Sequence, residues 1–198
     1  MARLTLLRAA DRLAVPWKNG GGVTREVAAS PDGAGFDRFD WRISMAEVAS
    51  DGPFSLFPGV DRTLAMLSGT MRLAIAGDGQ SAGVHDLTPY DPPLAFAGDV
   101  PVMGSLPGGP ASDLNLMVRR GRYRAALRRL TLSEAVAIDD GMTAIVIATA
   151  PTVVRLGEQT IALDVLDALR IDGAGHCTIA GDALLATVQR QSSITRAT

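Results

Sequence analysis

The stretch FDWRISMAEVAS, residues 39–50, decides the fold class, because apolar and polar side chains alternate along it. Successive side chains of a β-strand point to opposite faces, so Trp41 and Ile43 share one face and Arg42 and Ser44 share the other. This alternation predicts a strand that buries an apolar face and turns polar side chains to its second side.

The same kind of pattern recurs along the chain. Residues 23–30 and 112–121 alternate, residues 142–150 form a continuous apolar run, and residues 164–171 suit a short helix or the approach to a last pair of strands. Glycines (21) and prolines (11) separate these short runs, which is typical of a sandwich or barrel. The sequence therefore predicts an all-β fold.

Two short segments echo each other. FAGDVPVMGSL (96–106) and IAGDALLATVQ (179–189) each place a Gly-Asp turn before an apolar strand. This echo suggests two similar β modules. We expect residues 1–120 to form an N-terminal module with a ligand pocket and residues 121–198 to form a smaller C-terminal β module packed against it. Residues 119–130 would connect the two.

Charge and composition exclude several classes of function. A net charge of −2 argues against a general nucleic-acid binder. The arginine-rich segment 119–129 is better interpreted as a solvated connector, or as a face that pairs with nearby acids, than as an RNA site. No apolar run reaches the roughly 18 residues of a membrane span, and no signal-peptide pattern begins the chain. We expect a cytoplasmic protein that binds neither nucleic acid nor membrane, and a homodimer stays open.

The sequence favours neither a metal site nor a cofactor site. His85 and His176 are the only histidines and Cys177 is the only cysteine. His176 and Cys177 are adjacent and point to opposite faces of a strand, so they cannot chelate one ion. Acidic calcium loops, phosphate loops, dinucleotide fingerprints and nucleophile elbows are absent from the sequence. We predict no metal and no cofactor, and we interpret Cys177 as a core residue.

The segment PWKNGGGVTREV, residues 16–27, holds Lys18, the only lysine of the chain. Three following glycines would let backbone N–H groups approach an anion, and cationic and amide side chains can orient a carboxylate. The segment therefore suits the wall of an anion pocket. A flexible surface loop with structural ion pairs to Glu26, Asp40 or Asp61 explains the same residues, and the sequence leaves both interpretations open.

Four segments together resemble the HutD/Ves family: PWKNGGGVTREV, FDWRISMAEVASDGPFSLFPGVDRTLAMLSG, FAGDVPV and DLNLMVRRGR, which span about residues 14–124. The resemblance implies a cupin-type (RmlC-like jelly roll) β-sandwich with two cupin modules in one chain, a bicupin. It also implies a link to histidine utilisation. Where many cupins place metal ligands, GVDRTL carries Arg62, whose guanidinium repels a cation and attracts an anion.

The motifs that carry the resemblance nominate ten ligand-binding residues: Trp17, Lys18, Asn19, Thr24, Arg25, Arg42, Ser44, Arg62, Asp113 and Asn115. The resemblance implies a non-catalytic protein that binds a small carboxylate, such as N-formylglutamate or urocanate, and modulates histidine utilisation. The alternative is a metal-independent enzyme acting on a similar acid, with Lys18, Glu26 or Asp113 as its base. A scaffold that acts through a protein partner is a third hypothesis.

Overall fold

The computed structural model describes residues 2–35, 38–77 and 79–191. These residues form an all-β protein built from several antiparallel sheets, which confirms the predicted fold class. Within the described ranges, helical structure is limited to the three-residue 3-10 helix η1 (Ala9–Asp11). None of the described residues forms a helix long and apolar enough to span a bilayer.

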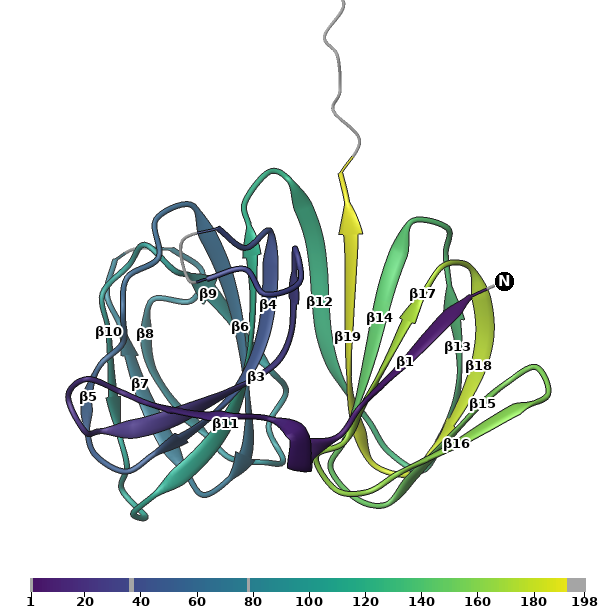
Figure 1. Cartoon of the computed structure of the whole chain (residues 1–198). Helices are drawn as coiled ribbons and strands as arrows, with labels where there is room; N and C mark the ends of the chain where they lie inside the picture. The colour runs from purple at the N-terminus through teal and green to yellow at the C-terminus, as the bar shows by residue number, and fades with distance from the viewer. Residues whose placement is uncertain (1, 36–37, 78, 192–198) are drawn as a thin grey trace, which may run out of the picture.

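The strands lie in two halves, which Figure 1 shows side by side. The N-terminal half contains β2 (Ala14–Pro16), β3 (Gly22–Ser30), β4 (Trp41–Val48), β5 (Gly52–Pro53), β6 (Val60–Ser68), β7 (Met71–Ile75), β8 (Gly83–Leu87), β9 (Leu94–Ala97), β10 (Val102–Ser105) and β11 (Ala111–Arg119). The C-terminal half contains β1 (Arg3–Leu7), β12 (Tyr123–Leu130), β13 (Ser133–Ile138), β14 (Met142–Ala148), β15 (Thr152–Leu156), β16 (Gln159–Leu163), β17 (Ala168–Asp172), β18 (Gly175–Ala180) and β19 (Ala183–Arg190).

Each half consists of a larger and a smaller sheet with apolar side chains between them. In the N-terminal half the larger sheet has the order β2-β3-β4-β11-β6-β9, and the smaller has the order β5-β10-β7-β8. Leu64 and Met66 of the larger sheet are buried in one cluster with Met71 and Leu73 of the smaller. In the C-terminal half the orders are β1-β17-β14-β19-β12 and β13-β18-β15-β16.

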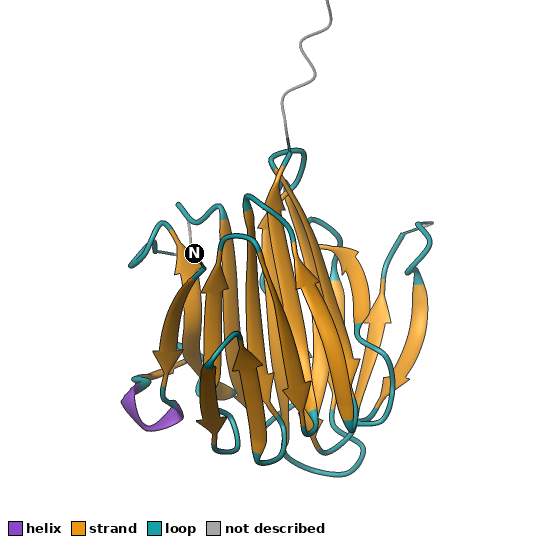
Figure 2. Ribbon diagram, turned by 90° about the vertical axis from the view of Figure 1, so that its right-hand side faces the viewer, coloured by secondary structure: helices purple, strands orange, loops and turns teal. Residues whose placement is uncertain are grey.

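The two larger sheets pack against each other through a shared apolar cluster, so the molecule is built in layers (Figure 1). Figure 2 views the strands from the side of the C-terminal half. Trp41 and Ile43 of β4 and Leu116 of β11 meet Ile145 and Leu184 of the C-terminal half. The apolar face predicted for residues 39–50 is therefore the face that joins the halves. The opposite face of β4 points into the N-terminal sandwich.

Strand order repeats between the halves. The orders β4-β11-β6-β9 and β5-β10-β7-β8 match β12-β19-β14-β17 and β13-β18-β15-β16 when every label is raised by eight. The first strands of the two sets begin at Trp41 and Tyr123. The echo noticed in the sequence does not mark this correspondence: its first copy spans β9 and β10, whereas its second spans β18 and β19.

One sequence expectation needs correction, and one open alternative is decided. Most of the predicted connector, residues 119–130, is strand β12, which pairs with β19 along its whole length. Tyr123 and Leu127 pack on the shared cluster while Arg124 and Arg128 are exposed, so an amphipathic strand accounts for the arginines. Residues 164–171 contain no helix and lead into β17.

The first strand crosses to the other half of the molecule. β1 pairs with β17 over residues 3–7, whereas a division at residue 120 places it in the N-terminal module. The segment between β1 and β2, residues 8–13, then crosses between the halves (Figure 1). We call this segment the strap.

Candidate functional site

Polar side chains line the inner face of the larger N-terminal sheet. We call this set the buried polar face: Thr24, Glu26, Arg42, Ser44, Arg62, Asp113 and Asn115. The alternation of β4 and β11 places these residues opposite the apolar side chains that join the two halves. Six of the ten residues nominated from the sequence belong to it, and Glu26 is the seventh member.

The strand register brings these residues together in rows. Ser44 lies directly opposite Glu26 on one side and opposite Asn115 on the other. Met117 lies between Arg42 and Arg62 in the next row. Side chains directly opposite one another have Cβ atoms about 4.5–5.5 Å apart. Glu26, Ser44 and Asn115 therefore form a continuous polar row across three strands, whereas Met117 separates Arg62 from Arg42.

Arg42 is held in place by its neighbours on this face. Its Nε donates to Glu26 Oε2 at 2.8 Å, and its Nη1 donates to Ser44 Oγ at 3.0 Å. Arg42 is buried while Glu26 is partly exposed. The charge of Arg42 is thus largely neutralised by a carboxylate that solvent can still reach.

Arg62 lies in an aromatic cage. Its guanidinium carbon is 5.0, 5.7 and 5.2 Å from the ring centroids of Phe54, Phe57 and Phe96. Aromatic faces attract a desolvated cation. Burial lowers the pKa of Arg62 to about 10, although nearby Asp113 opposes the shift. The side chain therefore stays charged at neutral pH.

Asp113 and Asn115 each add a side-chain oxygen that accepts no hydrogen bond from the described residues. Asp113 is buried, which raises its pKa to about 7 despite the opposing charge of Arg62. Arg62 Nε, Asp113 Oδ1 and Asn115 Oδ1 are buried without a hydrogen-bond partner among the described residues. Buried polar atoms are nearly always hydrogen-bonded in folded proteins. This face therefore offers one donor and two acceptors.

The lysine turn lies away from the buried polar face. Lys18 and Asn19 are exposed in the turn between β2 and β3. Asn19 Oδ1 accepts from the Gly21 backbone N–H at 3.0 Å, and the Gly20 N–H donates to the Trp17 carbonyl at 3.0 Å. The N–H groups of Gly20 and Gly21 thus donate hydrogen bonds within the turn.

Close packing accounts for the third glycine of the turn. A Cβ on Gly22 would collide with the carbonyl oxygen of Glu47 and crowd the Trp17 ring. Trp17 in turn donates from Nε1 to Thr24 Oγ1 at 2.7 Å, which links the turn to the polar face. Arg25 points to the opposite side of β3 and forms an exposed ion pair with Glu47.

A pocket of about 540 Å³ lies between the strap and β3. Because β2 pairs only with residues 23–25, the remainder of β3 forms an open edge. Thr24, Glu26 and Arg42 line the pocket, so it reaches the margin of the buried polar face. We call it the strap pocket, and its volume suits a small organic molecule. The other lining residues are Leu6, Leu7, Arg8, Asp11, Arg12, Leu13, Val15, Val27, Gly33 and Ala34.

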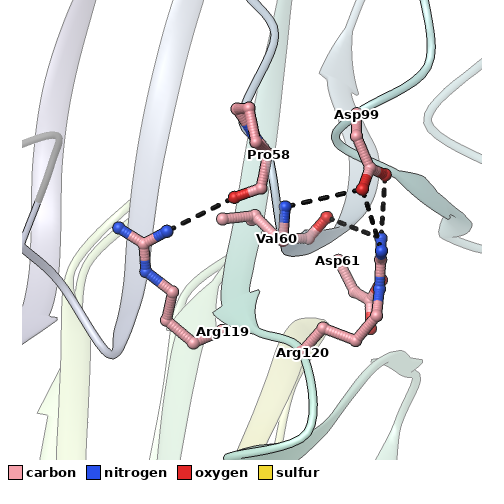
Figure 3. A network of polar contacts seen from close by, with 7 residues as sticks. Pro58, Val60, Asp61, Asp99, Arg119 and Arg120 are labelled. Atoms are coloured by element: carbon pink, nitrogen blue, oxygen red, sulfur yellow. Dashed lines mark hydrogen bonds and ion pairs between the residues drawn. The ribbon is translucent and has the colours of Figure 1, made fainter.

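The arginine-rich turn after β11 is occupied with structural contacts, as Figure 3 shows. Arg120 donates to Asp61 Oδ1 at 2.7 Å and to both oxygens of Asp99 at 2.9 Å. These hydrogen bonds hold the pKa of Asp99 well below its usual range. Arg119 donates to the carbonyl oxygens of Phe39 and Pro58. Arg119 and Arg120 thus pair with nearby acids and carbonyl groups. This agrees with the interpretation that the sequence favours over an RNA site.

Cys177 is buried, as expected of a core residue, and burial raises the pKa of its thiol. Over residues 2–35, 38–77 and 79–191, no group of three or more histidine, cysteine or acidic side chains is arranged to hold a metal ion. The polar chemistry of the described site is that of guanidinium, amide and carboxyl groups.

Sequence reasoning missed the aromatic cage and Arg12. Phe54 and Phe57 lie between the alternating segment 39–50 and Arg62, and Phe96 meets Arg62 through the pairing of β9 with β6. Their proximity to a nominated arginine was the available signal. Nothing in the sequence around Arg12 points to a pocket, because the pocket forms only where the strap crosses β3.

Comparisons with known proteins agree with this fold. The HutD family model matches residues 9–187. An uncharacterised 21.2 kDa protein from the hutC 3′ region of Pseudomonas putida is 37% identical over 175 residues, which cover 87% of this chain and 89% of that protein. Protein Ves of Citrobacter koseri is 42% identical over 113 residues, 57% of this chain and 56% of its own.

Solved structures give the same result. HutD from Pseudomonas fluorescens SBW25, in a formate condition, has a TM-score of 0.83 at 30% identity, covering 96% of this chain and all of that chain. A point mutant of oxalate decarboxylase OxdC from Bacillus subtilis has a TM-score of 0.62 at 8% identity, covering 95% of this chain and 77% of that one. The second likeness concerns the fold alone. Together they support the cupin-like β-sandwich expected from the sequence.

Proposed function

This chain belongs to the HutD family, and from that premise we propose that it is a non-catalytic protein that binds a small carboxylate and modulates histidine utilisation. The ligand lies on the buried polar face, whose margin at Thr24, Glu26 and Arg42 lines the strap pocket. N-formylglutamate and urocanate are the first candidates. The name of the Pseudomonas putida relative, which places it beside hutC, supports the association with histidine utilisation.

We also propose that the two halves are two cupin modules of one chain. The matching strand orders of β4–β11 and β12–β19 support this. The ligand pocket belongs to the N-terminal module, because the buried polar face lies on its larger sheet. The strap, residues 8–13, forms one wall of the strap pocket.

The observation that carries the proposal is the set of three unpartnered buried atoms: Arg62 Nε, Asp113 Oδ1 and Asn115 Oδ1. A carboxylate oxygen of the ligand satisfies Arg62, and an N–H group of the ligand satisfies Asp113 or Asn115. N-formylglutamate and urocanate each carry both groups. A hydrogen bond to a charged group contributes about 1.5–3 kcal/mol, so the loss of one such bond weakens binding about tenfold or more.

Calorimetric titration of the purified protein with N-formylglutamate, urocanate, formate and glutamate tests the proposal. At least one acid should bind saturably without forming product. Arg62→Met keeps an apolar side chain inside the aromatic cage and removes the charge, so affinity should fall at least tenfold. Unchanged affinity in a folded Arg62→Met protein would remove Arg62 from the site.

Arg72→Met is the matched control. Arg72 also lies on a strand of the N-terminal half, but it is exposed and paired with Asp86. Its loss should leave acid affinity unchanged. Heat from none of the four acids in the wild-type protein would refute the proposal for this ligand class.

A metal-independent enzyme is the second candidate, and Asp113 is the residue that favours it. A carboxyl group with a pKa near 7 can act as a general acid or base at neutral pH. Product formation from a bound acid, lost in Asp113→Asn with binding retained, would decide for catalysis. Lys18 is less suited to this role, because it lies exposed in the β2–β3 turn.

A further inference from the structure

Three arginines line the strap pocket, Arg8, Arg12 and Arg42, and Arg12 lies outside every motif that nominated a ligand-binding residue. We propose that Arg12 of the strap is the anion-binding residue of this pocket, and that the pocket takes an acid whose apolar body lies against the strap leucines. This inference goes beyond the proposed function, because it places an acid in the strap pocket itself, which Arg12 lines and Arg62 does not, and names the residue that receives the carboxylate there.

Arg12 is the arginine of the pocket that forms no ion pair among the described residues. Arg8 is paired with Asp167 at 2.6 Å, and Arg42 is paired with Glu26 at 2.8 Å. Arg12 instead donates to neutral acceptors, the carbonyl oxygens of Leu166 at 2.7 Å and Leu7 at 3.1 Å. No carboxylate of the described residues forms an ion pair with it.

The surroundings of Arg12 strengthen its attraction for an anion. Its Nε is buried and has no hydrogen-bond partner among the described residues. Burial lowers its pKa, although nearby Asp167 opposes the shift. Asp11 also lines the pocket, but it is exposed, where water and salt screen its charge. The partly buried guanidinium therefore dominates the electrostatics of this end of the pocket.

Three further side chains on the strap side of the pocket are apolar and exposed to solvent. Leu6, Leu13 and Val15 are 39%, 83% and 55% exposed, and all three line the pocket. Large apolar side chains gathered at a pocket with one cation suit a ligand that is both apolar and acidic. Glu26, partly exposed at the inner wall, can accept an N–H from the opposite end of the same ligand.

The carboxylate end of the ligand would thereby contact both halves of the protein. Arg12 belongs to the strap, and its Nη1 bonds both the Leu166 carbonyl of the C-terminal half and Met45 Sδ of β4. A bound acid thus adds a charge-assisted contact at the point where the strap crosses between the larger sheets.

Titration of urocanate and its primary amide into the full-length protein tests this assignment. The acid and the amide have the same shape and differ in charge, so wild-type protein should bind the acid at least tenfold more tightly. Arg12→Gln should abolish that preference, and Arg12→Lys should restore part of it. Arg72→Gln, at the exposed arginine paired with Asp86 in the smaller N-terminal sheet, should leave the preference intact.

A second pair of variants covers the case in which Arg12→Gln loosens the strap. Leu13→Asp puts a carboxylate on the exposed rim beside Arg12 and should weaken urocanate binding at least fivefold. Leu132→Asp, at a residue 82% exposed in the C-terminal half, is its matched control and should have no effect.

The outcomes separate the two proposals. Urocanate binding that is lost in Arg62→Met but unchanged in Arg12→Gln and Leu13→Asp overturns the assignment of Arg12 and leaves the carboxylate-binding function standing. Equal affinity of wild-type protein for the acid and the amide overturns it as well. Absence of binding by every acid tested overturns both.

Discussion

Asp113 combines three properties that seldom coincide in one carboxyl group. It is buried, its Oδ1 has no partner, and an arginine on the neighbouring strand opposes the effect of burial. Burial prevails, so its pKa rises to about 7. The folded protein consequently holds a proton on Asp113 over a pH range in which an unfolded chain releases it.

This proton makes stability depend on pH in a defined direction. A carboxyl group whose pKa is raised by folding contributes stability that is complete below its unfolded pKa near 4 and is lost as pH rises through 7. The free energy of unfolding should therefore fall between pH 4 and pH 7, with a slope of up to about 1.4 kcal/mol per pH unit from this group.

Denaturant unfolding at a series of pH values measures that slope. Asp113→Asn removes the titrating group and should flatten the profile. Asp86→Asn, at an exposed carboxylate paired with Arg72, should leave it unchanged. If the Asp113→Asn profile keeps the wild-type slope, the raised pKa of Asp113 is not its source.

Among the elements of the fold, the strap depends on one buried carboxylate. Asp167 accepts from Arg8 Nη1 at 2.6 Å, from the Ala9 backbone N–H at 2.7 Å and from the Asp164 N–H at 3.2 Å. Burial alone would raise the pKa of Asp167, but these hydrogen bonds together lower it. The ion pair and hydrogen bonds of Asp167 thus hold the strap in place between β1 and β2.

Asp167→Ala should release the strap and cost about 2 kcal/mol or more in the free energy of unfolding, because it leaves Arg8 and the Ala9 N–H without their acceptor. Hydrogen exchange should show faster exchange of the strap amides, residues 8–13, than in wild-type protein. Glu134→Ala, which removes an exposed partner of Arg128, should cost under about 1 kcal/mol. Unaltered strap exchange in Asp167→Ala would contradict this account.

The whole molecule is joined by the apolar cluster between the two larger sheets. Leu116 of β11 is buried in this cluster with Ile145, Leu184 and Val188 of the C-terminal half. Each larger sheet therefore has two covered faces, one against its own smaller sheet and one against the other half. Neither half can expose its larger sheet without exposing apolar surface.

The shared cluster predicts that the two halves unfold together. Leu116→Ala should lower the free energy of unfolding by about 2–5 kcal/mol, as for other large-to-small core substitutions. Calorimetry should show one transition that shifts as a whole. Val84→Ala, at an exposed residue of β8, should leave the transition in place. Two separate transitions, of which only one moves, would show that the halves are independent.

The sequence by itself determined the fold class and which polar residues share a face within one strand. Alternation is a local property of the chain, so Arg42 could be placed on the same face of its strand as Ser44, and Asp113 on the same face as Asn115, before any strand was paired. Lys18 and Arg25 show the limit of that reasoning, because nearness in sequence to the face did not place them on it.

Only the tertiary structure decided what surrounds that face. The cage of Arg62 needs β9 paired with β6 in one register, and the strap pocket needs β1 paired with β17 across the molecule. Such pairings join residues far apart in the chain, so their outcome depends on packing of all the sheets together. Arg12 acquires a pocket from the path of the strap, and no local pattern encodes that path.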